Sequence, residues 1–202
     1  MTNVVPTDRS APAGATSEDG ALLGLLFELV AGIYRAPGEP LREDLDSGAL
    51  LAALETVADA TGVEAPELPS PAWPALQSSH VELFVSSPSG VAAPPYVGFA
   101  IDDEVMGPSA QLLGAAFADY GIEVQDTWRD LPDHLAAVAE GGALLVRSGR
   151  SDAALALLEG FVAPWFERYT DAVAERDTSA FYGPITHFLR RTIEEVTRES
   201  RS

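Results

Sequence analysis

The sequence predicts an all-α fold, a single-domain bundle of six or seven helices. Apolar residues recur at spacings of three and four through most of the 202 residues, which is the period of one buried helix face. No segment alternates apolar and polar residues as a half-buried strand does. The absence of cysteine excludes disulfides, thiolate metal sites and cysteine nucleophiles together.

The individual elements follow from this period and from its start and stop residues. Residues 1–17, rich in Ala, Pro, Ser, Thr and Gly, are expected to form a flexible tail, and residues 18–202 the helical domain. Helices are expected, in order, around residues 22–33, 50–58, 72–85, 112–120, 132–149, 151–169 and 184–199. Pro132 suits the first turn of its helix, whereas Pro164 is expected to kink the helix that contains it.

One long segment, residues 86–109, interrupts the helical pattern. It reads SSPSGVAAPPYVGFAIDDEVMGPS and has too much Pro and Gly for regular structure. Connections of this length inside compact domains are usually functional or disordered. Because the segment also carries Val91, Tyr96, Val97, Phe99 and Ile101, we expect an ordered loop, at residues 88–101, packed on the bundle.

The net charge of the chain limits the classes of molecule that it can bind. Acidic residues outnumber basic ones 31 to 12, the net charge is −19, and all twelve basic residues are arginine. Nucleic acid is excluded as a partner, because a polyanion needs a basic footprint. A lysine-free, carboxylate-rich surface favours a halophile with molar salt in its cytoplasm. The alternative, codon bias in a GC-rich genome, does not by itself account for the acidity.

The chain is expected to be cytoplasmic, without stable membrane insertion. Its first residues lack the basic start and apolar run of a signal peptide. The most apolar segment, residues 21–34, is too short to span a bilayer and contains Glu28.

The dipeptide Asp133-His134 is the candidate for chemistry. It lacks a GxSxG nucleophile motif, and no metal-ligand spacing links His134 to the other two histidines, so no metal is expected. On the residues alone, the favoured interpretation is structural: Asp133 caps the helix that follows, and His134 makes one satisfied hydrogen bond. Two alternatives remain: a helical hydrolase with His134 as base and Ser86, Ser87 or Ser89 as nucleophile, and a non-specific helical scaffold.

The order of several short motifs suggests a family. Leu83-Phe84 precede a Gly/Pro stretch at residues 88–90, Pro94-Pro95-Tyr96 follow, and Pro132-Asp133-His134 open a later helix. In this order, within an all-helical chain of this size, the motifs resemble the TorD/DmsD/NarJ family of redox-enzyme maturation chaperones. The resemblance covers most of the chain from about Leu22 onward.

The resemblance implies a cytoplasmic chaperone and not an enzyme. Its partner would be the apo catalytic subunit of a molybdenum oxidoreductase, bound through the twin-arginine leader or N-terminus until cofactor insertion is complete and export follows. The resemblance implies no catalytic residue and no cofactor of the chaperone's own. A monomer is expected, with domain swapping through the long connectors as the alternative. The implied peptide-binding residues are Asp133, His134, Pro132, Tyr96, Phe99, Leu83 and Phe84.

Three positions depart from the family pattern. His80 stands where the family often has tyrosine, Val97-Gly98 where it often has Glu-Ser, and Gly141-Gly142 where bulky apolar residues usually follow a glutamate. The departures suggest a different choice of client. At the helix start, Asp133 is expected to cap the helix or to accept from a client arginine, and His134 to donate to the client backbone.

Overall fold

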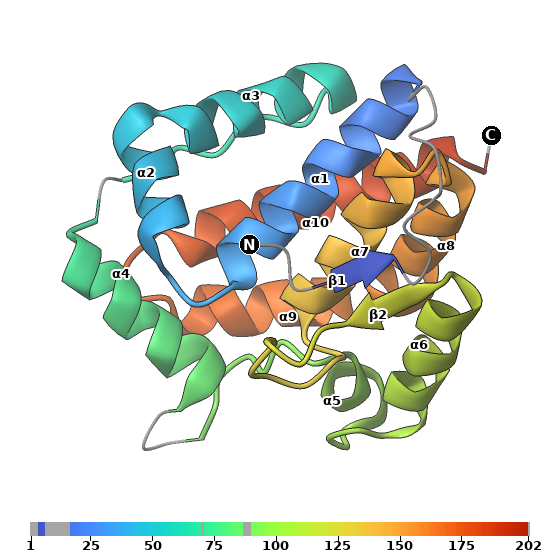
Figure 1. Ribbon diagram of the computed structural model, residues 1–202. Coiled ribbons are helices and arrows are strands. Elements are labelled where there is room, and N and C mark those ends of the chain that lie inside the picture. The colour runs from blue at the N-terminus through green and yellow to red at the C-terminus, as the bar shows by residue number, and fades with distance from the viewer. Residues whose placement is uncertain (1–3, 7–16, 70, 87–89, 202) are drawn as a thin grey trace. The chain divides into compact units, whose positions relative to one another are not determined.

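Helices dominate the computed structural model, which describes residues 4–6, 17–69, 71–86 and 90–201 (Figure 1). These residues form ten α-helices, one π-helical turn and one two-stranded sheet, which confirms the all-α class. The number of helices exceeds the six or seven expected, because two short helices were not predicted and one predicted helix is broken. Among the described helices, none alone is long and apolar enough to cross a membrane; α1 (Glu18–Tyr34) and α2 (Glu39–Ser47) qualify only as a pair bent by 117°.

The chain divides into two compact units, each drawn from two stretches of sequence. Unit 1 comprises residues 1–31 and 96–164, and unit 2 comprises residues 32–95 and 165–202. Helices α1 and α9 (Ala163–Arg176) each cross from one unit to the other.

Helix α7 (Leu135–Arg147) is the core element of unit 1 and is buried along most of its length. It packs against α8 and against the first strand. The other elements of unit 1 are β1 (Val4–Pro6), most of α1, α5 (Val97–Asp102), α6 (Pro108–Asp119), β2 (Ile122–Val124) and α8 (Ser151–Phe161).

Two glycines let neighbouring aromatic rings approach α7 closely. A Cβ at Gly141 would lie 2.9 Å from the Phe117 ring, and a Cβ at Gly142 would overlap the Phe27 ring. The rings of α6 and α1 therefore fill the space that bulkier residues would occupy at these positions. This packing gives a physical reason for the departure from the family pattern at Gly141-Gly142.

Part of the expected flexible tail is ordered. Val4–Pro6 form β1, which pairs antiparallel with β2, and Val4 is buried (Figure 1). Composition does not reveal this strand pairing or the buried valine. Residues 1–3 and 7–16 of the predicted tail lie outside the described residues.

Unit 2 is built around aromatic side chains. Its elements are α2, α3 (Ala49–Thr61), α4 (Trp73–His80), the π-helical turn η1 (Val81–Val85), most of α9, and α10 (Tyr182–Glu199). Tyr34 packs on Phe84, Phe166 and Tyr169 with ring centroids 5.6–6.3 Å apart, and its hydroxyl lies 2.7 Å from Thr186 Oγ1. Burial raises the pKa of Tyr34 above its ordinary value.

The helix boundaries have local structural causes. Gly62 ends α3 with φ of 69°, a left-handed conformation that glycine adopts without strain. The helix expected over residues 72–85 is present as α4 followed by η1. The helix expected over 151–169 is instead two helices, with a break at Val162 and Pro164 in the first turn of α9, where its missing N–H costs nothing.

Candidate functional site

The start of α7 differs from the prediction. The helix begins at Leu135, and His134 is its N-cap, with Nδ1 accepting a hydrogen bond from the backbone N–H of Ala136 at 3.1 Å. Pro132 therefore precedes the helix and is exposed, so its assignment to the first turn is wrong. Because Nδ1 accepts, the proton of the neutral ring is on Nε2.

Asp133 caps a different helix from the one predicted. Its Oδ2 accepts from the backbone N–H of Gly98 at 3.0 Å, in the first turn of α5. The backbone reinforces the link, because Val97 donates to the Asp133 carbonyl oxygen at 3.1 Å and Tyr96 pairs antiparallel with His134. The His134 side chain already accepts from the first turn of α7. The Asp133 carboxylate instead accepts from the first turn of α5, where the backbone N–H groups have no partner within the helix.

Aromatic rings enclose His134. The Tyr96 ring lies 5.3 Å from the imidazole and the Trp128 ring 5.5 Å, both in edge-on geometry. Trp128 is held in turn, because its Nε1–H donates to the Leu131 carbonyl oxygen at 2.9 Å. We call this cluster the Asp-His junction; it comprises Tyr96, Gly98, Trp128, Asp133 and His134.

Asp130 ties the junction to the preceding connector. Its Oδ1 accepts from the Tyr96 hydroxyl at 2.9 Å and from the backbone N–H of Leu131 at 2.7 Å. Asp130 and Trp128 were not among the predicted site residues, and Gly98 was named only as a departure from the family pattern. No local signal marks Asp130, because its partner Tyr96 lies 34 positions earlier.

Burial sets the electrostatics of the junction. Asp133 is 1% exposed, and its Oδ1 is buried without a hydrogen-bond partner. Burial therefore raises the pKa of Asp133, with a smaller upward contribution from Asp130, although the N–H of Gly98 and its own N–H stabilise the charged form. Burial also raises the pKa of Tyr96, and its hydrogen bond to Asp130 adds to that rise.

The segment after the junction turns back tightly on itself. A Cβ at Gly98 would lie 2.9 Å from the Glu104 carbonyl oxygen, so glycine permits the close contact between α5 and the turn before α6. Asp102 caps α6, with Oδ2 accepting from the Ser109 N–H at 2.7 Å and Oδ1 from the Ser109 hydroxyl at 2.9 Å. Two carboxylates, Asp133 and Asp102, thus fix α5 and α6, and the unpredicted helix α5 replaces part of the expected loop.

Phe99, another predicted contact, lies in α5 of unit 1 and is exposed, whereas the last two predicted site residues belong to unit 2. Leu83 and Phe84 are buried, and Phe84 packs on Tyr34, His80 and Tyr182. This packing accounts for both side chains without a ligand, and their role as peptide contacts stays a prediction. Ser86 also lies in unit 2, whereas Ser87, Pro88 and Ser89 lie outside the described residues.

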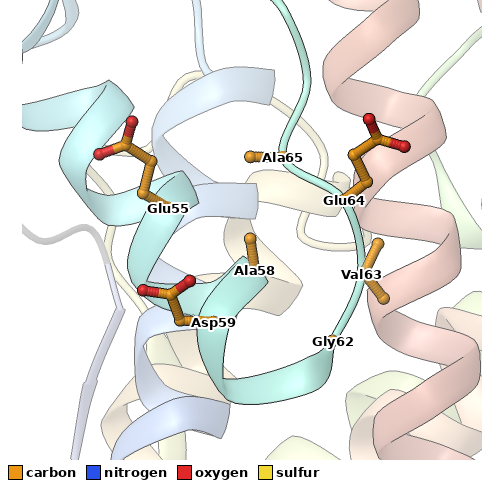
Figure 2. A pocket seen from close by; sticks show the side chains of 7 residues that line it. All are labelled: Glu55, Ala58, Asp59, Gly62, Val63, Glu64 and Ala65. Carbon is orange, nitrogen blue, oxygen red and sulfur yellow. The ribbon is translucent and has the colours of Figure 1, made fainter.

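Unit 2 also has a shallow acidic hollow of about 380 Å³. Its lining residues are Glu55, Ala58, Asp59, Gly62, Val63, Glu64 and Ala65. Figure 2 shows that the three carboxylates point apart and do not converge on a common point. Within the described residues, no group of three or more His, Asp or Glu side chains could hold a metal ion.

Comparison with solved structures identifies the class of fold. A crystal structure described as a redox enzyme maturation protein from Archaeoglobus fulgidus superposes with a TM-score of 0.58, covering 92% of this chain and 99% of that chain. The two sequences are 21% identical, so this likeness shows a shared helical fold. No curated protein matches the chain in sequence.

The family follows from the sequence itself. The family model described as nitrate reductase delta subunit matches residues 42–171, which is more than half of the chain and includes every motif of the Asp-His junction. The chain therefore belongs to the nitrate reductase delta subunit family, the NarJ- and TorD-type chaperones that its motifs resemble. It is a redox-enzyme maturation chaperone for molybdoenzymes.

Proposed function

We propose that the chain binds the twin-arginine leader, or the N-terminal segment, of the catalytic subunit of a molybdenum oxidoreductase. It holds the apo subunit in the cytoplasm until the molybdopterin cofactor has been inserted, and export follows. The chaperone turns over no substrate and carries no cofactor of its own.

The bond between Asp133 and Gly98 is the observation that carries the proposal. It joins the Pro132-Asp133-His134 motif to the segment that follows Pro94-Pro95-Tyr96, so two separate motifs of the family form one structural unit. Family membership supplies the molybdoenzyme as client.

The predicted residues differ in burial, and we assign them different roles accordingly. Asp133 and His134 are too buried to meet a ligand directly, so they act by positioning α5 and α7. Tyr96 is half-buried, whereas Phe99 and Pro132 are exposed, and these side chains offer apolar and aromatic surface to a peptide. An export leader supplies matching chemistry, since a basic start is followed by about 7–15 apolar residues.

The test is capture of the client from its native extract. The tagged full chain should retain a molybdenum oxidoreductase catalytic subunit, identified by mass spectrometry, and the captured subunit should lack molybdopterin. Phe99→Ser should capture less of it, whereas Leu51→Ser, a control at a similarly exposed apolar side chain of unit 2, should capture as much as the parent. Capture of no oxidoreductase, or of the cofactor-loaded subunit in equal amount, would overturn the proposal.

A further inference from the structure

Unit 1 displays a concentration of exposed apolar side chains on α5, α6 and the turn between them. Among the described residues, nine large apolar side chains are exposed, and five of them fall within residues 99–112. The α5–α6 face is defined here by these five, Phe99, Ile101, Val105, Met106 and Leu112. Exposed apolar surface of this kind, when contiguous and rimmed by polar residues, marks an interaction site.

The geometry of the turn holds apolar side chains out of the core. Met106 has φ of 58° and Asp103 has φ of 56°, in the left-handed region that residues other than glycine rarely adopt. Val105, between them, is 56% exposed, and Leu112 on the next helix is 64% exposed. Because Asp133 and Asp102 cap the two helices, the turn is fixed in this conformation.

Charge identifies the kind of partner that fits. Asp103 and Glu104 are exposed at the tip of the turn, and the sequence has no Arg or Lys between Arg42 and Arg129. The guanidinium of Arg150 donates to the Tyr120 carbonyl oxygen, just beyond the other end of α6. The apolar surface is therefore bordered by negative charge on the side where α6 begins.

The negative charge beside the apolar surface disfavours several kinds of binding partner. A second copy of the chain would bring another net charge of −19 to the same surface, and anionic lipid headgroups would be repelled in the same way. A cationic peptide with an apolar segment satisfies both parts of the surface. Leu112 is the fifth residue of α6, about 6 Å along the helix axis from Pro108, so the apolar surface covers the first part of this helix.

We infer that the α5–α6 face is the docking surface for the client leader, with the leader arginines beside Asp103 and Glu104 and its apolar run over the start of α6 toward Leu112. This inference rests on the proposed function and adds the surface and the direction of binding. Asp133 and His134 are buried and act as positioning residues: Asp133 holds α5, and His134 caps α7. The face lies entirely within unit 1.

Titration of the full chain with a synthetic peptide tests the surface. The probe carries two consecutive arginines followed by a run of about twelve leucines and alanines, with a fluorophore at its C-terminus. Leu112→Asp and Val105→Asp should each weaken binding by at least about tenfold, because each replaces a side chain that the peptide buries with a charge. Leu51→Asp is the matched control, since Leu51 is 45% exposed on α3 and lines a separate hollow of about 440 Å³ in unit 2.

A photoreactive phenylalanine analogue in the peptide tests the direction. Placed next to the arginines it should crosslink to residues 103–106, and placed at the end of the apolar run it should crosslink near Leu112. The melting temperatures of the three variants should stay near that of the parent, because all three positions are at the surface.

The outcomes separate the inference from the proposed function. If the parent binds and the Leu112 and Val105 variants bind equally well, or if only Leu51→Asp loses affinity, the leader docks elsewhere and the inference fails while the proposed function stands. If the parent does not bind the peptide and captures no oxidoreductase, both fail. Crosslinking confined to residues 44–69 would likewise overturn the surface while supporting leader binding.

Discussion

Removal of the Asp133 carboxylate is expected to destabilise α5 more than any other helix. In Asp133→Ala the N–H of Gly98 loses its acceptor, and because Gly98 is buried, water does not replace the lost bond. A buried donor left unsatisfied costs about 1–3 kcal/mol. For a domain of this size, 1 kcal/mol lowers the melting temperature by roughly 2–4 °C, so a cost of about 2 kcal/mol lowers it by about 4–8 °C.

Asp133→Asn is the matched control for this loss. The amide oxygen can still accept from the Gly98 N–H, so the unfolding free energy should stay within about 1 kcal/mol of the parent. Urea denaturation gives the free energies, and amide hydrogen exchange of Gly98, Phe99 and Ala100 reports α5 directly. Equal stability of the alanine and asparagine variants, or unchanged exchange in α5 of Asp133→Ala, would refute the capping role.

The pH dependence of the same pair tests the electrostatics. The folded pKa of Asp133 lies above its ordinary value of 3.8, so between these two pKa values the folded state binds more protons than the unfolded state. The contribution of this carboxyl to the unfolding free energy is therefore full below pH 3.8 and is lost as the pH rises through the folded pKa. Relative to Asp133→Asn, the parent should lose stability across that window, and a relative gain with rising pH would contradict the assignment.

Three further predictions concern packing and salt. Gly142→Ala should lower the free energy of unfolding by about 1–3 kcal/mol, because the added methyl group would overlap the Phe27 ring. Gly160→Ala, with open space around it, should raise that free energy by about 0.5–1 kcal/mol. Equal effects of the two substitutions on the melting temperature would contradict this packing. Tyr34→Phe should lower the unfolding free energy by about 0.5–1.5 kcal/mol through loss of its hydrogen bond to Thr186, and a variant as stable as the parent would contradict that contribution. Affinity for the leader peptide should hold or rise up to about 1 M salt, where the Debye length is about 3 Å, and a steep fall by calorimetric titration would assign recognition to charge instead.

The helical fold could be predicted from sequence because apolar periodicity acts over ten or more residues. Helix α5 escaped prediction because it is six residues long, contains Gly98, and depends on a cap supplied 35 positions away. Strand β1 escaped for a similar reason, since three residues carry no periodic signal and its partner lies near Glu123.

The sequence singled out Asp133 and His134, but it did not predict the contacts that these two residues make. Asp133 was expected to cap the helix that follows it, because an aspartate before a helix usually does so, and His134 was expected to make one satisfied hydrogen bond. The structure divides them between α5 and α7, and only the tertiary arrangement reveals the division. The exposed α5–α6 face was not predicted either, since Phe99 and Ile101 were expected to pack on the bundle.

Amide hydrogen exchange of the full chain, with and without the twin-arginine peptide, tests the central claim most directly. Binding on the α5–α6 face should slow exchange across residues 97–112, with a smaller effect around Leu135 at the start of α7. Exchange in residues 44–69 of unit 2 should not change. Protection confined to residues 44–69, or no protection at a peptide concentration that saturates binding, would contradict the account.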